Sequence, residues 1–209
     1  METFSNLESL DTNTLKLILR NAMAEKQEKS QNDFLSFVKE VWPEFIQGHH
    51  HKVYAEKLDR VARGELKRLI VNMPPRHTKS EFASHLFPAY FMGRNPKAKL
   101  IQTTHTGELS IRFGRKTKNL LESDEYAEIF PGVRLAADSK AAGRWESNHG
   151  GEYFAAGVGG AITGRVLIFL LLMILIPSRT LSRLLFWTVI TSGILLALVS
   201  VFSLAALLY

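Results

Sequence analysis

Cysteine is absent from this chain of 209 residues. A disulfide framework and a thiolate metal site are therefore both excluded. Acidic residues are absent from the C-terminal region: all 20 lie before Arg165, and residues 166–209 carry only Arg179 and Arg183 as charged residues. The composition therefore changes abruptly at residue 166, and no linker sequence separates residues 1–165 from residues 166–209.

The C-terminal region consists mainly of two long apolar runs. Residues 166–176 are all apolar, and residues 184–209 contain no charge. A transmembrane helix needs about 20 apolar residues, so only the second run is long enough to span a bilayer. This composition predicts a hydrophobic tail over residues 166–209 that forms helices, with residues 184–208 as a candidate membrane span.

The remaining residues have the pattern of a globular domain preceded by a helical segment. The net charge of +6 fits contact with nucleic acid or with an acidic membrane surface. Apolar periodicity and turn residues predict helices over residues 12–29, 33–41, 51–63, 80–91 and 108–122, and strands over 67–73, 99–104, 143–147 and 152–156. Because strands alternate with helices, we expect an α/β domain with a largely parallel sheet over residues 33–165, after a helical segment over residues 1–32.

Glycine is also missing from a connection between a predicted strand and a predicted helix, where a phosphate-binding loop would normally contain it. Residues 71–82, VNMPPRHTKSEF, connect an apolar strand pattern to a helix pattern. A phosphate-binding loop occupies such a connection and follows the pattern G-x-x-x-x-G-K-[ST]. Alignment of Lys79 and Ser80 with the end of this pattern puts Met73 and Thr78 at its two glycine positions. The segment is either a phosphate loop without glycine or an ordinary turn in which Lys79 is solvated and Ser80 caps the helix.

Several segments together resemble one known family. RLIVNMPPRHTKSEFAS, followed by KLIQTTHTGELSIRFGRKTKNLL, is similar to the ATPase domain of the terminase large subunit of tailed phages, the motor that packages viral DNA. The upstream segment FVKEVWPEFIQGHHHKVYAEKLDRVARGELKR and the downstream segment GGEYFAAGVGGAITGR resemble the same family. The similarity extends over residues 34–165, and PPRHTKS is its most specific part.

The resemblance implies a partial P-loop NTPase domain that takes ATP and Mg²⁺. It assigns the phosphates to Lys79, the Mg²⁺ ion to the hydroxyl of Ser80 and an auxiliary phosphate contact to Arg76. His77 and Thr78 complete the nucleotide-binding segment that it implies.

The resemblance also implies macromolecular partners. These are double-stranded DNA, the small terminase subunit and the portal, in an oligomeric motor in the host cytoplasm. The basic residues of the predicted helix over residues 108–122 are candidates for DNA contact by their charge alone, and the alternative is that they form a solvated face: Arg112, Arg115, Lys116 and Lys118. Expression of the hydrophobic tail would make the protein membrane-associated.

A feature that such an ATPase needs is missing downstream. We expect a P-loop ATPase to carry an acidic pair at the end of a neighbouring strand, with one carboxylate that holds Mg²⁺ and another that polarises the attacking water. In the family, a strand of the form GADLLIIDDP, with an acidic pair, follows the Gly-Arg of the ITGR-like segment, whereas here VLIFLLLMILIP follows Arg165.

One DNA string encodes both versions of this strand. GGTGCTGATCTTCTTATTATTGATGATCC gives GADLLIIDD when translated from its first base, and VLIFLLLMI, which is residues 166–174, when translated from its second. The same offset over residues 191–209 permits a second family-like stretch, EWYTSGPRQRLQPGG. We therefore expect a frameshift of one nucleotide just after Arg165, and the competing interpretation is a genuine membrane tail.

These patterns predict a fragment of a DNA-packaging terminase large subunit. The family is an ATPase and endonuclease, and we expect this chain to bind nucleotide but to hydrolyse it negligibly, because the acidic pair is missing. Two other classes are alternatives. One is a small membrane-anchored protein with a soluble binding head, and the other is a helicase-like ATPase outside packaging.

Overall fold

A computed structural model describes residues 11–74, 76–139, 141–157, 169–175 and 195–201. The helical elements are α2 (Thr12–Asn32), α3 (Phe34–Val41), α4 (His49–Ala62), α5 (Lys79–Glu81), the π-helix η1 (Phe82–Leu86), α6 (Phe87–Arg94), α7 (Gly107–Leu121) and α8 (Asp124–Ile129). The strands are β1 (Arg68–Met73), β2 (Lys99–Thr104), β3 (Arg144–Glu146), β4 (Glu152–Gly157), β5 (Phe169–Leu175) and β6 (Leu195–Val201). The predicted α/β class is confirmed.

The described strands form one sheet in the order β1-β6-β5-β2-β4-β3. The pairings of β1 with β6, β6 with β5, β5 with β2 and β2 with β4 are parallel, whereas β3 and β4 form an antiparallel pair. Because β1, β6, β5, β2 and β4 run in one direction, their carboxyl ends lie at the same edge of the sheet. Loops at this edge are where open α/β sheets bind their ligands.

The prediction of hydrophobic helices in the tail is wrong for the two segments of it that the structure describes. Both β5 and β6 are strands, and they pair with each other over seven residues between β1 and β2. The reason is that a short, continuous apolar run suits a strand inside a parallel sheet as well as it suits a helix, so periodicity does not distinguish them. Residues 176–194 and 202–208, which make up most of the candidate span, lie outside the described residues. In the described part of the chain, no helix has the length and apolar character needed to cross a bilayer.

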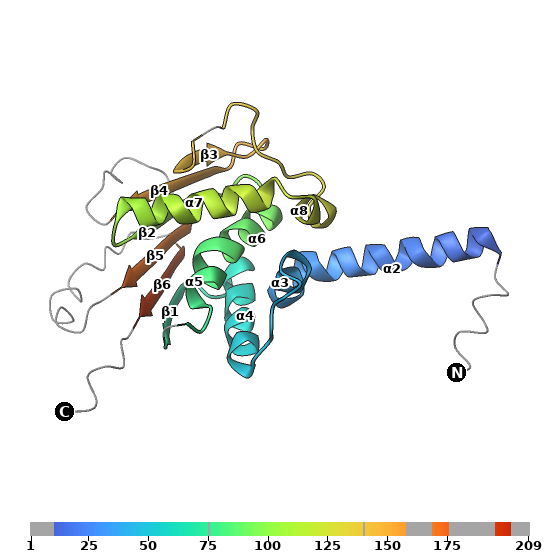
Figure 1. The fold of residues 1–209 in the computed structure, drawn as a ribbon, viewed down its shortest axis with the longest axis horizontal. Helices are drawn as coiled ribbons and strands as arrows, with labels where there is room; N and C mark the ends of the chain where they lie inside the picture. Colours follow the sequence, from blue (N-terminus) through green and yellow to red (C-terminus); the bar gives the residue numbers. More distant parts are fainter. Residues whose placement is uncertain (1–10, 75, 140, 158–168, 176–194, 202–209) are drawn as a thin grey trace.

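Aromatic packing holds the helices that follow β1 against the first helices of the domain. The ring of Phe34 on α3 contacts the rings of Phe82, Phe87 and Tyr90 at centroid distances of 5.4, 5.7 and 5.3 Å. All four side chains are fully buried. Such rings bury large apolar areas and pack with edge-to-face geometry. These contacts pack η1 and α6 against α3, and Figure 1 shows these helices beside the sheet.

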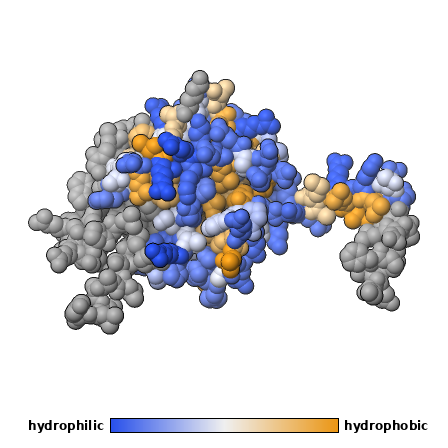
Figure 2. Space-filling view, in the orientation of Figure 1, coloured by the Kyte–Doolittle hydropathy of each residue, from blue (hydrophilic) through white to orange (hydrophobic). Residues whose placement is uncertain are grey.

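Helix α2 projects away from the body of the molecule (Figure 1). Its C-terminal end is attached, because Ser30 is buried and the side-chain amide of Gln31 donates a hydrogen bond of 2.6 Å to the carbonyl oxygen of Ile129. Figure 2 shows apolar surface on the projecting part. The large apolar side chains exposed there are Leu15, Leu17, Ile18, Leu19 and Met23. The helical segment predicted before residue 33 is therefore a separate arm joined at one end.

Candidate functional site

The glycine-free loop lies at the carboxyl end of β1. Strand β1 ends at Met73, and α5 begins at Lys79. The intervening loop exposes the side chains of Arg76 and His77 to solvent, while Lys79 is only 4% exposed. The loop therefore sits at the edge of the sheet where ligands bind, and it presents cationic and hydrogen-bonding groups there.

The backbone of this loop has the conformation that glycine normally provides. Arg76 has φ 64° and Thr78 has φ 57°, and no other non-glycine residue of the described chain has a positive φ. The left-handed conformation costs about 1–2 kcal/mol for a residue with a Cβ, and it is most unusual for a β-branched residue. Thr78 stands at the second glycine position of the phosphate-loop pattern. The loop thus has a glycine-like backbone at a position where the sequence has threonine.

Lys79 folds back over the loop. Its Nζ donates a hydrogen bond of 2.7 Å to the carbonyl oxygen of Met73, the residue at the first glycine position. Burial lowers the pKa of Lys79 below its usual value. Two details expected for an ordinary turn differ in the structure: Lys79 is buried rather than solvated, and the N-cap residue of α5 is Thr78 rather than Ser80.

A histidine from α4 contacts the loop, which sequence reasoning did not anticipate. The Nε2 atom of His51 lies 2.6 Å from the Oγ1 atom of Thr78. The residues are 27 positions apart, and only the packing of α4 beside β1 brings them together. No sequence signal identifies this pair, because the run His49, His50 and His51 suggests at most metal binding. Within the described residues, no group of three or more His, Cys, Asp or Glu residues is placed to hold a metal ion.

The first acidic residue after the loop is held by two basic side chains. Glu81 accepts a hydrogen bond of 2.6 Å from Lys116 Nζ, and its other carboxylate oxygen lies 3.1 Å from His85 Nδ1. Two hydrogen bonds lower the pKa of Glu81 to about 2 despite its partial burial. The bond with His85 has the larger effect, and the bond with Lys116 has the smaller one. Glu81 is therefore a charged link between α5 and α7.

The four basic residues of α7 divide into two pairs. Lys116 bonds to Glu81, and Lys118 Nζ donates a hydrogen bond of 2.8 Å to the carbonyl oxygen of Ser139. Arg112 and Arg115 are exposed. The structure thus gives the two lysines contacts within the fold and leaves the two arginines on the surface.

The strands next to β1 carry no carboxylate. Residues 166–209 contain no acidic residue, and β6 and β5, the next two strands of the sheet, both belong to this region. Positions 173 and 174 lie near the carboxyl end of β5, where they pair with residues 199 and 200 of β6. This is the edge of the sheet at which the loop after β1 also lies.

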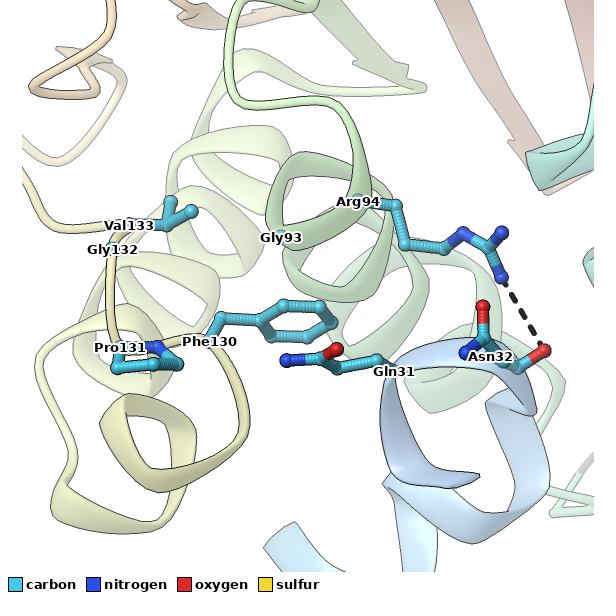
Figure 3. A pocket seen from close by; sticks show the side chains of 8 residues that line it. All are labelled: Gln31, Asn32, Gly93, Arg94, Phe130, Pro131, Gly132 and Val133. Atoms are coloured by element: carbon cyan, nitrogen blue, oxygen red, sulfur yellow. Dashed lines mark hydrogen bonds between the residues drawn. The ribbon is translucent and has the colours of Figure 1, made fainter. Parts of the chain in front are cut away.

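A cavity of ≈ 430 Å³ lies elsewhere in the molecule, beside the C-terminal end of α6 (Figure 3). Its lining residues are Gln31, Asn32, Gly93, Arg94, Phe130, Pro131, Gly132 and Val133. The guanidinium of Arg94 donates a hydrogen bond to the carbonyl oxygen of Asn32 at its rim. Helix α6 leads into the start of β2, whereas the loop follows the end of β1, so this cavity and the loop are separate features.

Comparison of the chain with models of known protein families and with curated proteins gave no match. The fold and the loop together define an α/β protein with a strained, cation-bearing connection at the carboxyl edge of its sheet.

Proposed function

We propose that this chain is the ATP-binding part of a DNA-packaging motor of the terminase large-subunit type, and that it is defective in hydrolysis. The proposal rests on one observation: Lys79 bonds back to the carbonyl of Met73 while Thr78 adopts the left-handed conformation. A phosphate loop orients its backbone N–H groups, its lysine and the following helix toward a phosphate in this way. The strand, loop and helix together support a P-loop fold.

The groups of the loop fit a polyphosphate with its metal ion. Lys79 supplies an ammonium group and Arg76 an exposed guanidinium group, and both pair well with phosphate oxygens. Ser80 is half-buried in the first turn after the loop, where its hydroxyl is available as the protein ligand for Mg²⁺. His77 and Thr78 contribute backbone to the same segment. Bound ATP would supply the phosphoanhydride bond whose hydrolysis drives such motors.

This chain lacks the acidic pair that would be expected to support ATP hydrolysis. Under the frameshift hypothesis, the other reading frame would encode Asp-Asp at positions 173 and 174, which lie at the carboxyl end of β5. The frame used here encodes Met and Ile instead. Glu81 is a poor substitute, because Lys116 and His85 already bind its carboxylate. Nucleotide binding without turnover is therefore the activity that these residues support.

Contact with double-stranded DNA is proposed for the exposed arginines of α7. Arg112 and Arg115 present guanidinium groups to solvent, as contact with the phosphate backbone requires. Lys116 and Lys118 have contacts within the fold and are weaker candidates. The portal, the small terminase subunit, an oligomeric state and the host cytoplasm follow from the resemblance alone.

The test of this function is binding of a fluorescent ATP analogue with Mg²⁺, measured by anisotropy. Lys79→Ala is expected to weaken binding by at least about tenfold, since it removes a charge-assisted hydrogen bond to phosphate. Lys97→Ala is the matched control, because Lys97 is exposed and precedes the amino end of β2, far along the strands from the loop. Equal affinity of the K79A and K97A proteins would contradict the assignment, and rapid Mg²⁺-dependent hydrolysis by the unaltered chain would contradict the predicted inactivity.

A further inference from the structure

We propose that His51 is a positioning residue that replaces the missing glycine of the loop, because it holds Thr78 in the left-handed conformation through the threonine hydroxyl. The inference rests on the proposed nucleotide site and assigns to that site a residue outside the phosphate-loop pattern.

The hydrogen bonds around His51 form one consistent chain. The backbone N–H of Gly48 donates to His51 Nδ1 over 2.8 Å, so the ring is neutral and its proton is on Nε2. Nε2–H then donates to Thr78 Oγ1 over 2.6 Å, and the hydroxyl of Thr78 donates in turn to the carbonyl oxygen of His77 over 2.7 Å. Each donor in the chain has an acceptor, so the arrangement specifies the direction of every bond.

The imidazole is well suited to act as a fixed anchor. His51 is 5% exposed, and its ring packs against Phe45 at 4.8 Å and Phe82 at 5.3 Å between centroids. Its position is therefore set by the aromatic core and by the first turn of α4. Because the ring is fixed, the hydrogen bond from Nε2 holds the Thr78 hydroxyl at one position.

The anchor opposes the intrinsic preference of threonine. A β-branched residue avoids positive φ, whereas glycine adopts it without steric cost. Two hydrogen bonds to one hydroxyl compensate for that penalty and keep the backbone between Arg76 and Lys79 in its observed shape. Without His51, Thr78 is expected to relax toward negative φ, and Lys79, the next residue, would lose its present orientation toward the carbonyl oxygen of Met73.

A double-mutant cycle between His51 and Thr78 tests this role. Binding of the fluorescent ATP analogue with Mg²⁺ is measured for the unaltered chain, H51A, T78G and H51A/T78G. His51→Ala is expected to weaken binding about tenfold, through loss of a buried hydrogen bond that orients the loop. In the T78G background the same change is expected to alter binding by less than about twofold, because glycine needs no anchor.

The controls separate this role from simpler explanations. His49→Ala changes an exposed neighbour on the same helix and is expected to leave binding unchanged. Thr78→Val replaces the hydroxyl by a methyl group and is expected to match H51A, so the role of the hydroxyl remains testable if H51A disturbs the core. An equal loss from His51→Ala in both backgrounds would overturn the proposal, since it would mean that His51 acts without Thr78.

A second measurement distinguishes failure of this inference from failure of the nucleotide site. Thermal unfolding of the same four proteins without nucleotide is expected to show coupling, with a larger loss of Tm from His51→Ala when Thr78 is present. Absence of binding by the unaltered chain, with this coupling intact, would overturn the proposed function alone. Binding by the unaltered chain without coupling in either measurement would overturn only the role of His51.

Discussion

Glu81 is the residue beside the loop whose ionisation depends most on its neighbours. His85, on the same helical run, and Lys116, on α7, both bind its carboxylate, and together they lower its pKa from 4.5 to about 2. A carboxylate whose folded-state pKa is depressed stabilises the fold above its unfolded-state pKa, and this stabilisation is lost as the pH falls. The window for Glu81 is therefore between 4.5 and about 2.

The corresponding prediction concerns Glu81→Gln. At neutral pH this change is expected to lower the free energy of unfolding, and the deficit should shrink as the pH is lowered through 4.5 toward about 2. Urea unfolding across that range measures the effect, with Glu44→Gln at an exposed position as the control. A deficit that is the same at every pH would show that the carboxylate charge contributes nothing and that only packing was lost.

At the scale of elements, α7 packs closely against β4 and the residues before β3 at Gly114. A Cβ placed on Gly114 would lie 2.5 Å from the carbonyl oxygen of Ala142 and 3.0 Å from the ring of Tyr153. The backbone oxygen has little freedom to move away, because the chain continues from Ala142 into β3 and its hairpin with β4. Glycine at this helical position therefore permits the close packing of α7 on β4.

Gly114→Ala tests this packing. In a helix interior, alanine is normally more stabilising than glycine by about 1 kcal/mol. A loss of stability in G114A would therefore come from the steric conflict of the added Cβ. We expect the free energy of unfolding to fall by about 1–3 kcal/mol, measured by chemical denaturation. Gly132→Ala is the matched control, because a Cβ there meets nothing within 4 Å. A G114A protein as stable as the unaltered chain would show that α7 and β4 separate without cost.

At the scale of the whole molecule, one sheet contains strands from the charged region, residues 1–165, and from residues 166–209, which have no acidic residue. Strands β6 and β5, from the region without acidic residues, lie between β1 and β2 of the charged region. Under the frameshift hypothesis, the other frame would encode LLIIDD at positions 169–174 of β5, with four apolar residues followed by two aspartates. The frameshift hypothesis therefore places its two aspartates at the carboxyl edge of the sheet, where the loop after β1 also lies.

Restoring the frame after Arg165 provides the test at this scale. The chain translated in the restored frame is expected to gain Mg²⁺-dependent ATP hydrolysis at least about 100-fold above that of the present chain, because it regains the acidic pair. Release of phosphate measures the activity. The control is the restored chain with both aspartates at positions 173 and 174 replaced by asparagine. A gene whose codons for residues 164–175 do not permit the second frame would end the frameshift hypothesis before any protein is made.

The sequence by itself determined several of the local elements and supplied the candidate residues of the site. The strand over Lys99–Thr104 was predicted with its observed bounds, and the helix after the loop was predicted because its apolar spacing and its lysine and serine are local signals. Sequence missed α8, which is a single short helix. It also predicted helices where β5 and β6 are strands, because a continuous apolar run has no period.

Only the tertiary structure showed how the loop adopts a left-handed backbone at Thr78, where the phosphate-loop pattern has glycine. The left-handed backbone at Thr78 and its support from His51 depend on contact between α4 and a loop 27 residues away, and no local pattern encodes that contact. The same holds for the link between Glu81 and Lys116. Residue types determine what a site can bind, whereas packing between distant segments determines which backbone conformation the site holds while it binds.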